Sequence, residues 1–456
     1  MSMRNKGLTA ILALALAGLV LLCPGAARAA GAVVTLDQAL DLALAYSPKL
    51  KAAQEALAAA RFSQKEAFTY FLPTLGTSYA WKRMQDEPTV SLNGMNFQTG
   101  SLNTYQWSTY LSQPIFTGFR LTSTYRLAEL GVDLAKLDLR LAQLDLVVAV
   151  KEAYLEYLRA QKSWKVAQQA VRQLKAHLKV SQDFYDVGII PINDVLKTKV
   201  GLSSAQQEEV KAKNAVDLAR SKLNVLLGRP VQDELEVKDI LRYRRVEITY
   251  DQAHRIALEK RPELKALALR LKQADQAITQ AQSQYYPQVS LRGAYNFTSD
   301  KPELGDNDYY DPSGWEVSTQ VEWTFWEWGR TRHRVSRRRA QKRRLGNLEN
   351  DLKDQVGLQV KQAILFLRES EKNIFTAKVA ITQAKENYRI TLERFKEQLT
   401  TNTELLDAQV LLTNAQNNYF TALTVYNLAK ARLWRFMGLG RGDFPPGAGG
   451  AKTADM

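Results

Sequence analysis

The sequence predicts a mainly helical chain that carries four membrane-type β-strands and arose by internal duplication. The segment Thr35–Arg83 aligns without a gap with residues 249–297, with 15 identities. Residues 194–206 align in the same way with residues 404–416. In each copy the hydrophobic period changes from 3.6 to 2 and back again. Two copies of so long a unit exclude a short-period solenoid and favour a pseudo-symmetric body.

Residues 1–29 are expected to form a secretory signal peptide. Arg4 precedes an apolar run over residues 8–22, and an A-R-A sequence at the end offers a cleavage site. The run is too short to cross a bilayer as a helix. Cys23 is the single cysteine and would leave with the signal; its lipidation is the alternative, although Leu22 is a poor neighbour for that reaction. A mature chain without cysteine depends on packing rather than on disulfides.

The two repeats, residues 30–228 and 249–438, each open with a pair of helices. A threonine followed three positions later by glutamine, at Thr35 and Thr249, fits a capping box. A proline then restarts the helix at its first position, and another proline ends it. Residues 229–248 are expected to form an irregular equatorial linker between the repeats, and residues 439–456 a disordered tail.

After the helices, apolar and polar residues alternate in four segments: 74–83, 104–116, 288–298 and 314–326. Each is about as long as the ~9–11 residues that a tilted strand needs to cross hydrocarbon. Their aromatic residues are expected to form a membrane girdle: Trp81, Tyr105, Trp107, Trp315 and Trp323. The alternative is a pair of hairpins in a soluble sandwich, but the chain offers no second sheet for packing.

Four strands cannot close a barrel, because the smallest membrane barrels have about eight. Unpaired backbone groups at an open edge cost several kcal/mol each in lipid. Several chains must therefore share one barrel if these strands span a membrane. Three copies would give twelve strands.

A proline-free helical segment follows the strands of each repeat, over residues 118–187 and 329–398. Such a helix is on the order of 100 Å long, and its 3-4 apolar spacing predicts coiled-coil packing. Each ends in a tight turn, for which Gly188 suits the first repeat. The return helices are expected to start at Asn193 and Thr403 as caps and to reach residues 228 and 438.

Taken together, the order, spacing and duplication of these motifs resemble the TolC-type outer-membrane efflux proteins. The resembling segments are TLDQALDLALAYSP, FLPTLG, QPIFTGFR, DVLKTKVGLSSAQ and their second copies. The resemblance implies a homotrimer with a twelve-stranded barrel in the outer membrane and a helical tunnel reaching into the periplasm. It also implies an exit duct for an inner-membrane pump, joined through a periplasmic adaptor (membrane fusion protein).

The resemblance further implies a periplasmic gate at the helical tip, and the expected gate residues are Glu404, Asp407 and Asp194. Three copies of Glu404 and Asp407 would form an acidic ring that attracts cations; ordinary solvated acids at a helix N-terminus are the alternative. The family's Tyr and Arg that tie the tip to this Asp are replaced by Phe395 and Thr400. The expected adaptor-facing tip comprises Gly188, Ile189, Ile190, Leu399 and Thr400.

Nine Lys and Arg residues lie between Arg330 and Arg344, where the first repeat is not basic. A solvated helix face, contact with anionic headgroups and a positive collar in the tunnel are the three interpretations. The formal net charge of +15 does not indicate nucleic-acid binding in an exported protein. The acidic loop over residues 298–314 is expected to be solvated rather than a Ca²⁺ site.

The histidines are scattered without the spacing of a metal site, and no nucleophile–base pair or phosphate loop occurs, so neither an enzyme nor a cofactor is expected. The predicted function is therefore that of the outer-membrane exit duct of a tripartite efflux system for small molecules. The outer-membrane channel of a type I protein secretion system is one alternative. A periplasmic coiled-coil adaptor or scaffold without a pore is the alternative of another class. The sequence does not identify the cargo or the particular pump.

Overall fold

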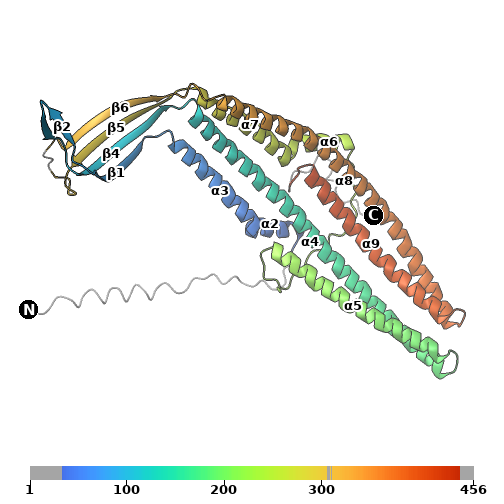
Figure 1. The fold of residues 1–456 in the computed structure, drawn as a ribbon. Coiled ribbons are helices and arrows are strands. Elements are labelled where there is room, and N and C mark those ends of the chain that lie inside the picture. The colour runs from blue at the N-terminus through green and yellow to red at the C-terminus, as the bar shows by residue number, and fades with distance from the viewer. Residues whose placement is uncertain (1–32, 306–308, 310, 442–456) are drawn as a thin grey trace, which may run out of the picture.

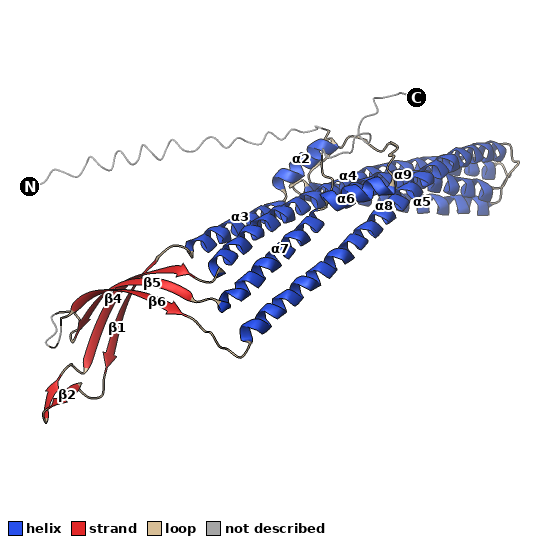
Figure 2. Cartoon of the chain, turned by 90° about the horizontal axis from the view of Figure 1, so that it is seen from above, coloured by secondary structure: helices blue, strands red, loops and turns tan. Residues whose placement is uncertain are grey.

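The computed structural model describes residues 33–305, 309 and 311–441. A curved sheet lies at one end of an elongated molecule, and two helical hairpin turns lie at the other (Figure 1; Figure 2). The predicted signal peptide over residues 1–29 lies outside the described residues.

The two repeats contain the same elements in the same order, except that the first has an additional hairpin and the second an additional 3-10 turn. The first repeat comprises α2 (Leu36–Tyr46), α3 (Pro48–Thr69), β1 (Thr74–Arg83), β2 (Thr89–Leu92), β3 (Met95–Gln98), β4 (Asn103–Phe116), α4 (Arg120–Asp186) and α5 (Ile192–Leu226). The second comprises α6 (Tyr250–Lys260), α7 (Pro262–Gln282), the 3-10 turn η1 (Ser283–Tyr285), β5 (Gln288–Ser299), β6 (Ser313–Glu322), α8 (Arg330–Lys396) and α9 (Asn402–Phe436).

Local sequence signals account for the helix boundaries near the middle of the molecule. Thr35 and Thr249 both form capping boxes with the glutamine three positions later, which satisfies two backbone donors at each helix start. At the junction with the sheet, Gly118 has φ +59°, and a Cβ there would lie 2.4 Å from the carbonyl oxygen of Ser283. Glycine is therefore required where the start of α4 passes the end of α7.

The four long strands form one antiparallel sheet in the order β1-β4-β5-β6, in which β4 and β5 join the two repeats. Within the described residues, β1 and β6 each have a single partner, so both edges of the sheet are open. The sheet is too small to close on itself. An open edge presents a row of unpaired N–H and C=O groups, which needs a partner strand in any apolar surrounding.

Several expected boundaries are wrong, each for a local reason. The strand expected over residues 314–326 ends at Glu322, because pairing with β5 stops at Gln288. Asn193 and Thr403 are not caps: α5 begins at Ile192 after Pro191, and the Thr401 side chain caps α9 by accepting from the Glu404 N–H. At both helix starts the residue two positions before the expected cap already has the extended backbone that a cap requires.

The loop between β1 and β4 contains the β2–β3 hairpin, whose turn residues Asn93 and Gly94 both have positive φ. The prediction that a disordered tail starts at residue 439 is wrong for residues 439–441. Leu439 is buried and its N–H donates to the carbonyl of Trp434, while Arg441 binds Asp41. Residues 442–456 lie outside the described part of the chain.

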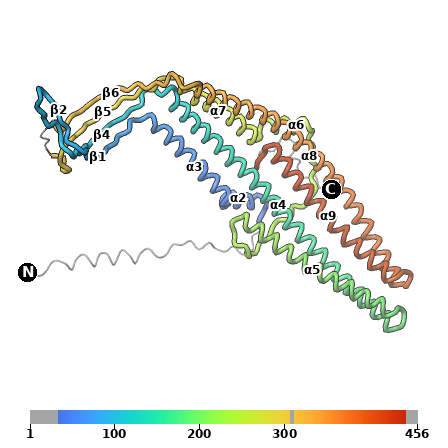
Figure 3. The backbone as a smooth tube through the Cα atoms, in the orientation of Figure 1, coloured from blue at the N-terminus to red at the C-terminus, as the bar shows by residue number. Residues whose placement is uncertain are grey.

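Two hydrophobic clusters, one in each repeat, hold the middle of the molecule. They surround Tyr154 on α4 and Tyr426 on α9, which are almost fully buried. The Tyr154 hydroxyl donates to the Val34 and Lys238 carbonyls at 3.0 and 2.8 Å, and the Tyr426 hydroxyl to the Arg244 carbonyl at 2.8 Å. The linker between the repeats is thus hydrogen-bonded to α4 and to α9, and it lies at the side of the long helices (Figure 3).

Candidate functional site

The sheet has one apolar and one polar face, because the strand register places like residues in rows. The rows on the apolar face include Leu75, Leu111, Gly293 and Val317; Thr77, Thr109, Tyr295 and Trp315; and Tyr79, Trp107 and Phe297. The rows on the polar face include Gly76, Tyr110, Ala294 and Glu316; Ser78, Ser108 and Asn296; and Ser112, Arg292 and Ser318. This two-faced pattern is typical of strands between lipid and a polar lumen.

Four of the predicted girdle residues, Trp81, Tyr105, Trp107 and Trp315, lie on the apolar face, toward the strand ends distant from the helices. Trp315 is 78% exposed in the single chain, so its ring is available to lipid or to a neighbouring chain. Trp323 lies just beyond β6 at the helical end, where its Nε1–H donates to the Tyr285 carbonyl at 3.2 Å. The predicted aromatic residues therefore occupy both ends of the sheet.

At the opposite end, the two hairpin turns between α4 and α5 and between α8 and α9 lie together (Figure 1; Figure 3). They contain the predicted tip residues Gly188, Ile189, Ile190, Leu399 and Thr400. Ile189 and Leu399 are exposed apolar side chains. The exposed side chains of Ile192, Leu196 and Val200 continue this apolar surface along one stripe of α5.

Gly188 has φ +78°, and the N–H of the next residue, Ile189, donates to the Phe184 carbonyl. In the second repeat Gln398 takes the same left-handed conformation, with φ +59°. Leu399 N–H then donates to the Arg394 carbonyl at 2.7 Å. Both long helices thus end in the same type of turn, although one uses a residue that is strained there.

The predicted gate acids Glu404 and Asp407 lie one turn apart on the exposed side of α9. Glu404 accepts a hydrogen bond from the Thr400 hydroxyl, which orders the carboxylate at the start of the helix. Within the described residues, neither acid has a cationic partner within 4 Å. Both side chains are exposed in the single chain.

The third predicted gate residue, Asp194, contributes its backbone rather than its carboxylate to the contact between the two helical hairpins. Its carboxylate lies 3.4 Å from Lys197 on the same helix. Its carbonyl accepts a hydrogen bond from the Asn402 side-chain amide on α9 at 2.9 Å. This contact joins α5 to α9 just inside the tip.

Asn402 is the centre of a buried polar cluster that sequence reasoning missed. Its Oδ1 accepts from Thr198 at 3.1 Å and lies 2.6 Å from His177 Nε2. The His177 ring packs edge-on against Phe395, with centroids 4.9 Å apart. These four side chains come from α9, α5, α4 and α8, and each is at most 5% exposed. We call His177, Thr198, Phe395 and Asn402 the tip clasp.

The hydrogen-bond pattern sets the protonation of the clasp. Because the Asn402 amide nitrogen donates to a carbonyl, its oxygen faces His177, so Nε2 carries the proton. His177 Nδ1 has no hydrogen-bond partner within the described residues. Burial lowers the pKa of His177, and the hydrogen bond to Asn402 only partly opposes this. The ring is therefore neutral at neutral pH.

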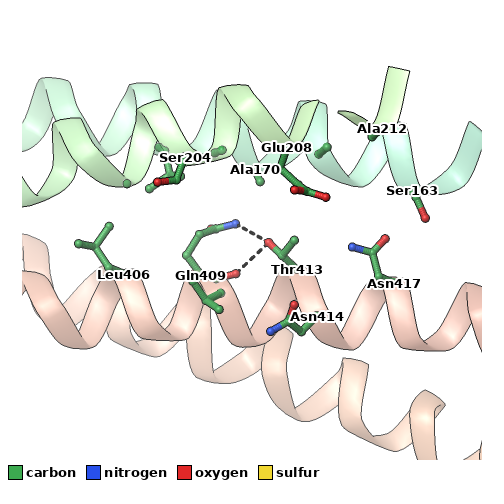
Figure 4. A pocket seen from close by; sticks show the side chains of 15 residues that line it. Ser163, Ala170, Ser204, Glu208, Ala212, Leu406, Gln409, Thr413, Asn414 and Asn417 are labelled. Carbon is green, nitrogen blue, oxygen red and sulfur yellow. Dashed lines mark hydrogen bonds between the residues drawn. The ribbon is translucent and has the colours of Figure 1, made fainter. Parts of the chain in front are cut away.

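A groove of about 370 Å³ follows the clasp between α4, α5 and α9. Mostly small residues line the α4 and α5 side, together with Leu174 and Glu208, while the α9 side presents Gln409, Thr413 and Asn417 (Figure 4). The Gln409 amide donates to Gln173 at 3.0 Å and to Thr413 at 3.2 Å. The side-chain oxygens of Gln409 and Asn417 are buried without a partner in the described structure. The groove therefore has unused hydrogen-bond acceptors.

The described residues contain no helix that is both long and apolar enough to span a bilayer. In that part of the chain, no three His, Cys, Asp or Glu residues are grouped as metal ligands would be. Asp306 and Asp308 of the acidic loop lie outside the described residues.

Comparison with known proteins supports the same architecture. The sequence model of the family described as "Outer membrane efflux protein" matches residues 39–229 and again residues 254–439. AprF of Pseudomonas aeruginosa, an alkaline protease secretion protein, is 24% identical over 87% of this chain and 83% of its own length. The outer membrane protein TolC of Vibrio cholerae is 23% identical over 62% of this chain and 67% of its own.

Solved structures share the fold at low sequence identity. The CmeC outer membrane channel of Campylobacter jejuni superimposes with a TM-score of 0.77 at 17% identity, over 88% of this chain and 85% of that one. The outer membrane protein VceC of Vibrio cholerae gives 0.73 at 18% identity, over 89% and 96%. Since the family match covers both repeats and the fold agrees, the chain belongs to the outer membrane efflux protein family, and it lies in the outer membrane with its helices extending into the periplasm.

Proposed function

We propose that three copies of this chain form the outer-membrane exit duct of a tripartite export system. The observation that carries this proposal is a four-stranded sheet with one apolar face and two open edges. Three such sheets joined edge to edge close a barrel of twelve strands and leave no unpaired backbone in lipid. Transport through the duct is passive, and an inner-membrane pump supplies the energy.

The helical tip is the periplasmic gate in this proposal. Three copies each of Glu404 and Asp407 line the opening, where crowded carboxylates attract cations and repel anions. The tip clasp holds the α4–α5 and α8–α9 hairpins together and replaces the tie that Phe395 and Thr400 cannot form. Neutralising both acids as Glu404→Gln/Asp407→Asn should reduce the cation preference of single channels; an unchanged preference would refute the ring.

The periplasmic adaptor contacts the tip through its exposed apolar residues. Ile189 and Leu399 in the turns and the apolar stripe on α5 support this assignment, because exposed apolar patches at one end of a protein mark protein contacts. The groove beside α9 extends the same surface with hydrogen-bond acceptors. Replacing Ile189 and Leu399 by Ser should weaken capture of the adaptor without changing conductance.

The cargo that fits this duct best is a pumped small molecule, since the family is one of efflux proteins. Protein secretion is the second candidate, because the similarity to the secretion protein AprF extends over 87% of this chain. A deletion strain exposed to panels of drugs and metals, with its secreted proteins profiled in parallel, separates the two. Restored resistance on complementation supports efflux, and a restored exported protein supports secretion. If complementation restored neither of them, the export role would be refuted.

A further inference from the structure

The basic segment at the start of α8 has a charge that the fold itself does not use. Arg330, Arg332, Arg334, Arg337, Arg338, Arg339, Lys342, Arg343 and Arg344 lie within its first turns. In the described structure, carboxylates lie within 4 Å of two of them: Glu327 is 3.7 Å from Arg330 and Asp275 is 2.6 Å from Lys342. We call these nine residues the basic collar.

The collar is not needed for helix formation. The equivalent start of α4 carries Arg120 and Arg126 but also Glu129 and Asp133, and it forms a helix of the same 67 residues. Cations in the first turn of a helix oppose its dipole, and neighbouring cations repel one another. A countercharge from outside the chain would relieve both effects.

The position of the collar indicates where that countercharge lies. The seven residues between β6 and α8 include four exposed aromatic side chains: Trp323, Phe325, Trp326 and Trp328. Trp328 is 85% exposed, and its ring contacts that of Trp326 at 5.6 Å. Clustered exposed tryptophans at a strand end are typical of the boundary between lipid and water.

The first turns of α8 then lie at headgroup depth. The helix starts where the other helices also meet the sheet (Figure 2). At ~1.5 Å per residue, Arg334 and Arg337 lie about 6 and 10 Å along the helix from Arg330. That span matches the Debye length of ~8–10 Å over which surface charge attracts cations at physiological salt.

We propose that the first part of the basic collar, from Arg330 to Arg337, binds anionic phospholipid headgroups of the periplasmic leaflet, with the tryptophans beside it at the acyl boundary. Guanidinium groups suit this partner because they bind phosphate oxygens in bidentate pairs. The proposal depends on the membrane position of the sheet and is independent of the cargo.

The test is lipid retention by the full mature protein, measured by native mass spectrometry after exchange into nanodiscs of phosphatidylethanolamine with or without phosphatidylglycerol. Wild type should retain phosphatidylglycerol preferentially. The R332Q/R334Q/R337Q variant should bind it more weakly by at least about 10-fold, and up to about 100-fold if each charge acts at the surface. An R332K/R334K/R337K variant should retain most of the preference.

The matched control is K372Q/K378Q/K385Q, which removes three exposed lysines farther along the same helix and should leave lipid retention unchanged. None of the three has a carboxylate partner within the described residues. Two results would overturn the proposal. Equal retention by wild type and R332Q/R334Q/R337Q would show a merely solvated face. Unchanged retention with altered ion selectivity of single channels would place the collar inside the tunnel. Export assays on the same variant report on the duct separately.

Discussion

Truncating Asn402 to alanine should release the gate. The side chain is 2% exposed and takes part in three hydrogen-bonding contacts, to the Asp194 carbonyl at 2.9 Å, to Thr198 at 3.1 Å and to His177 at 2.6 Å. Net contributions of about 0.5–1.5 kcal/mol for each of these three contacts give a total loss of about 2–4 kcal/mol. Alanine is a better helix former than asparagine, so the substitution does not lower the helix propensity of α9.

If the clasp forms only in the closed tip, that loss lowers the ratio of closed to open by about 30- to 700-fold per chain. Single-channel recording in planar bilayers measures this directly, as longer open times and higher mean conductance. Asn414→Ala is the matched control, because Asn414 is exposed on the same helix and has no hydrogen bond among the described contacts. Equal closed times in Asn402→Ala, Asn414→Ala and wild type would show that the tip clasp does not hold the gate closed.

A double-mutant cycle identifies the partner. His177→Phe keeps an aromatic ring against Phe395 and removes the hydrogen bond to Asn402. Residues that share one contact couple by about 0.5–3 kcal/mol. The change in the free energy of opening should therefore be smaller in the double variant than the sum of the changes in the two single variants. Strict additivity would show that His177 and Asn402 act separately.

Three further outcomes concern stability, each followed by thermal unfolding of the mature protein. Gln398→Gly should stabilise by about 1 kcal/mol, because glycine adopts the left-handed turn without strain; a lower melting temperature would contradict this. Since burial places the folded pKa of His177 below its ordinary 6.5, the unfolded state binds more protons, so stability should fall as pH drops below 6.5, and His177→Gln should flatten that slope. Arg435→Gln should lower the free energy of unfolding by about 1–2 kcal/mol, because it unpairs Asp145 at 2.6 Å and Glu263 at 2.9 Å. At the exposed Arg432 the same substitution should lower it by less than about 1 kcal/mol. Equal losses would show that burial has no effect.

The duplicated architecture could be predicted because its signals are local. Capping boxes at Thr35 and Thr249, prolines at helix ends and period-2 runs each depend on a few neighbouring residues. The β2–β3 hairpin also had a local signal, the Asn93-Gly94 pair, which favours a two-residue turn and was overlooked. The end of β6 depends on where pairing with β5 stops, which no local pattern specifies.

The tip clasp could not be predicted in the same way, because its four residues come from four helices. One signal did exist: His177 and Ser181 follow Leu174 at 3-4 spacing, which places polar residues on a buried stripe of α4. That pattern indicates a buried polar contact but not its partner. Asn402 could be found only once the two hairpins were seen side by side.

In the proposed duct a single chain supplies one third of a closed wall, since its sheet keeps two open edges. Native mass spectrometry of the purified mature protein in detergent tests this most directly. We expect a species of three chains that conducts ions when reconstituted. A stable single chain, or an assembly of another size with the same conductance, would contradict it.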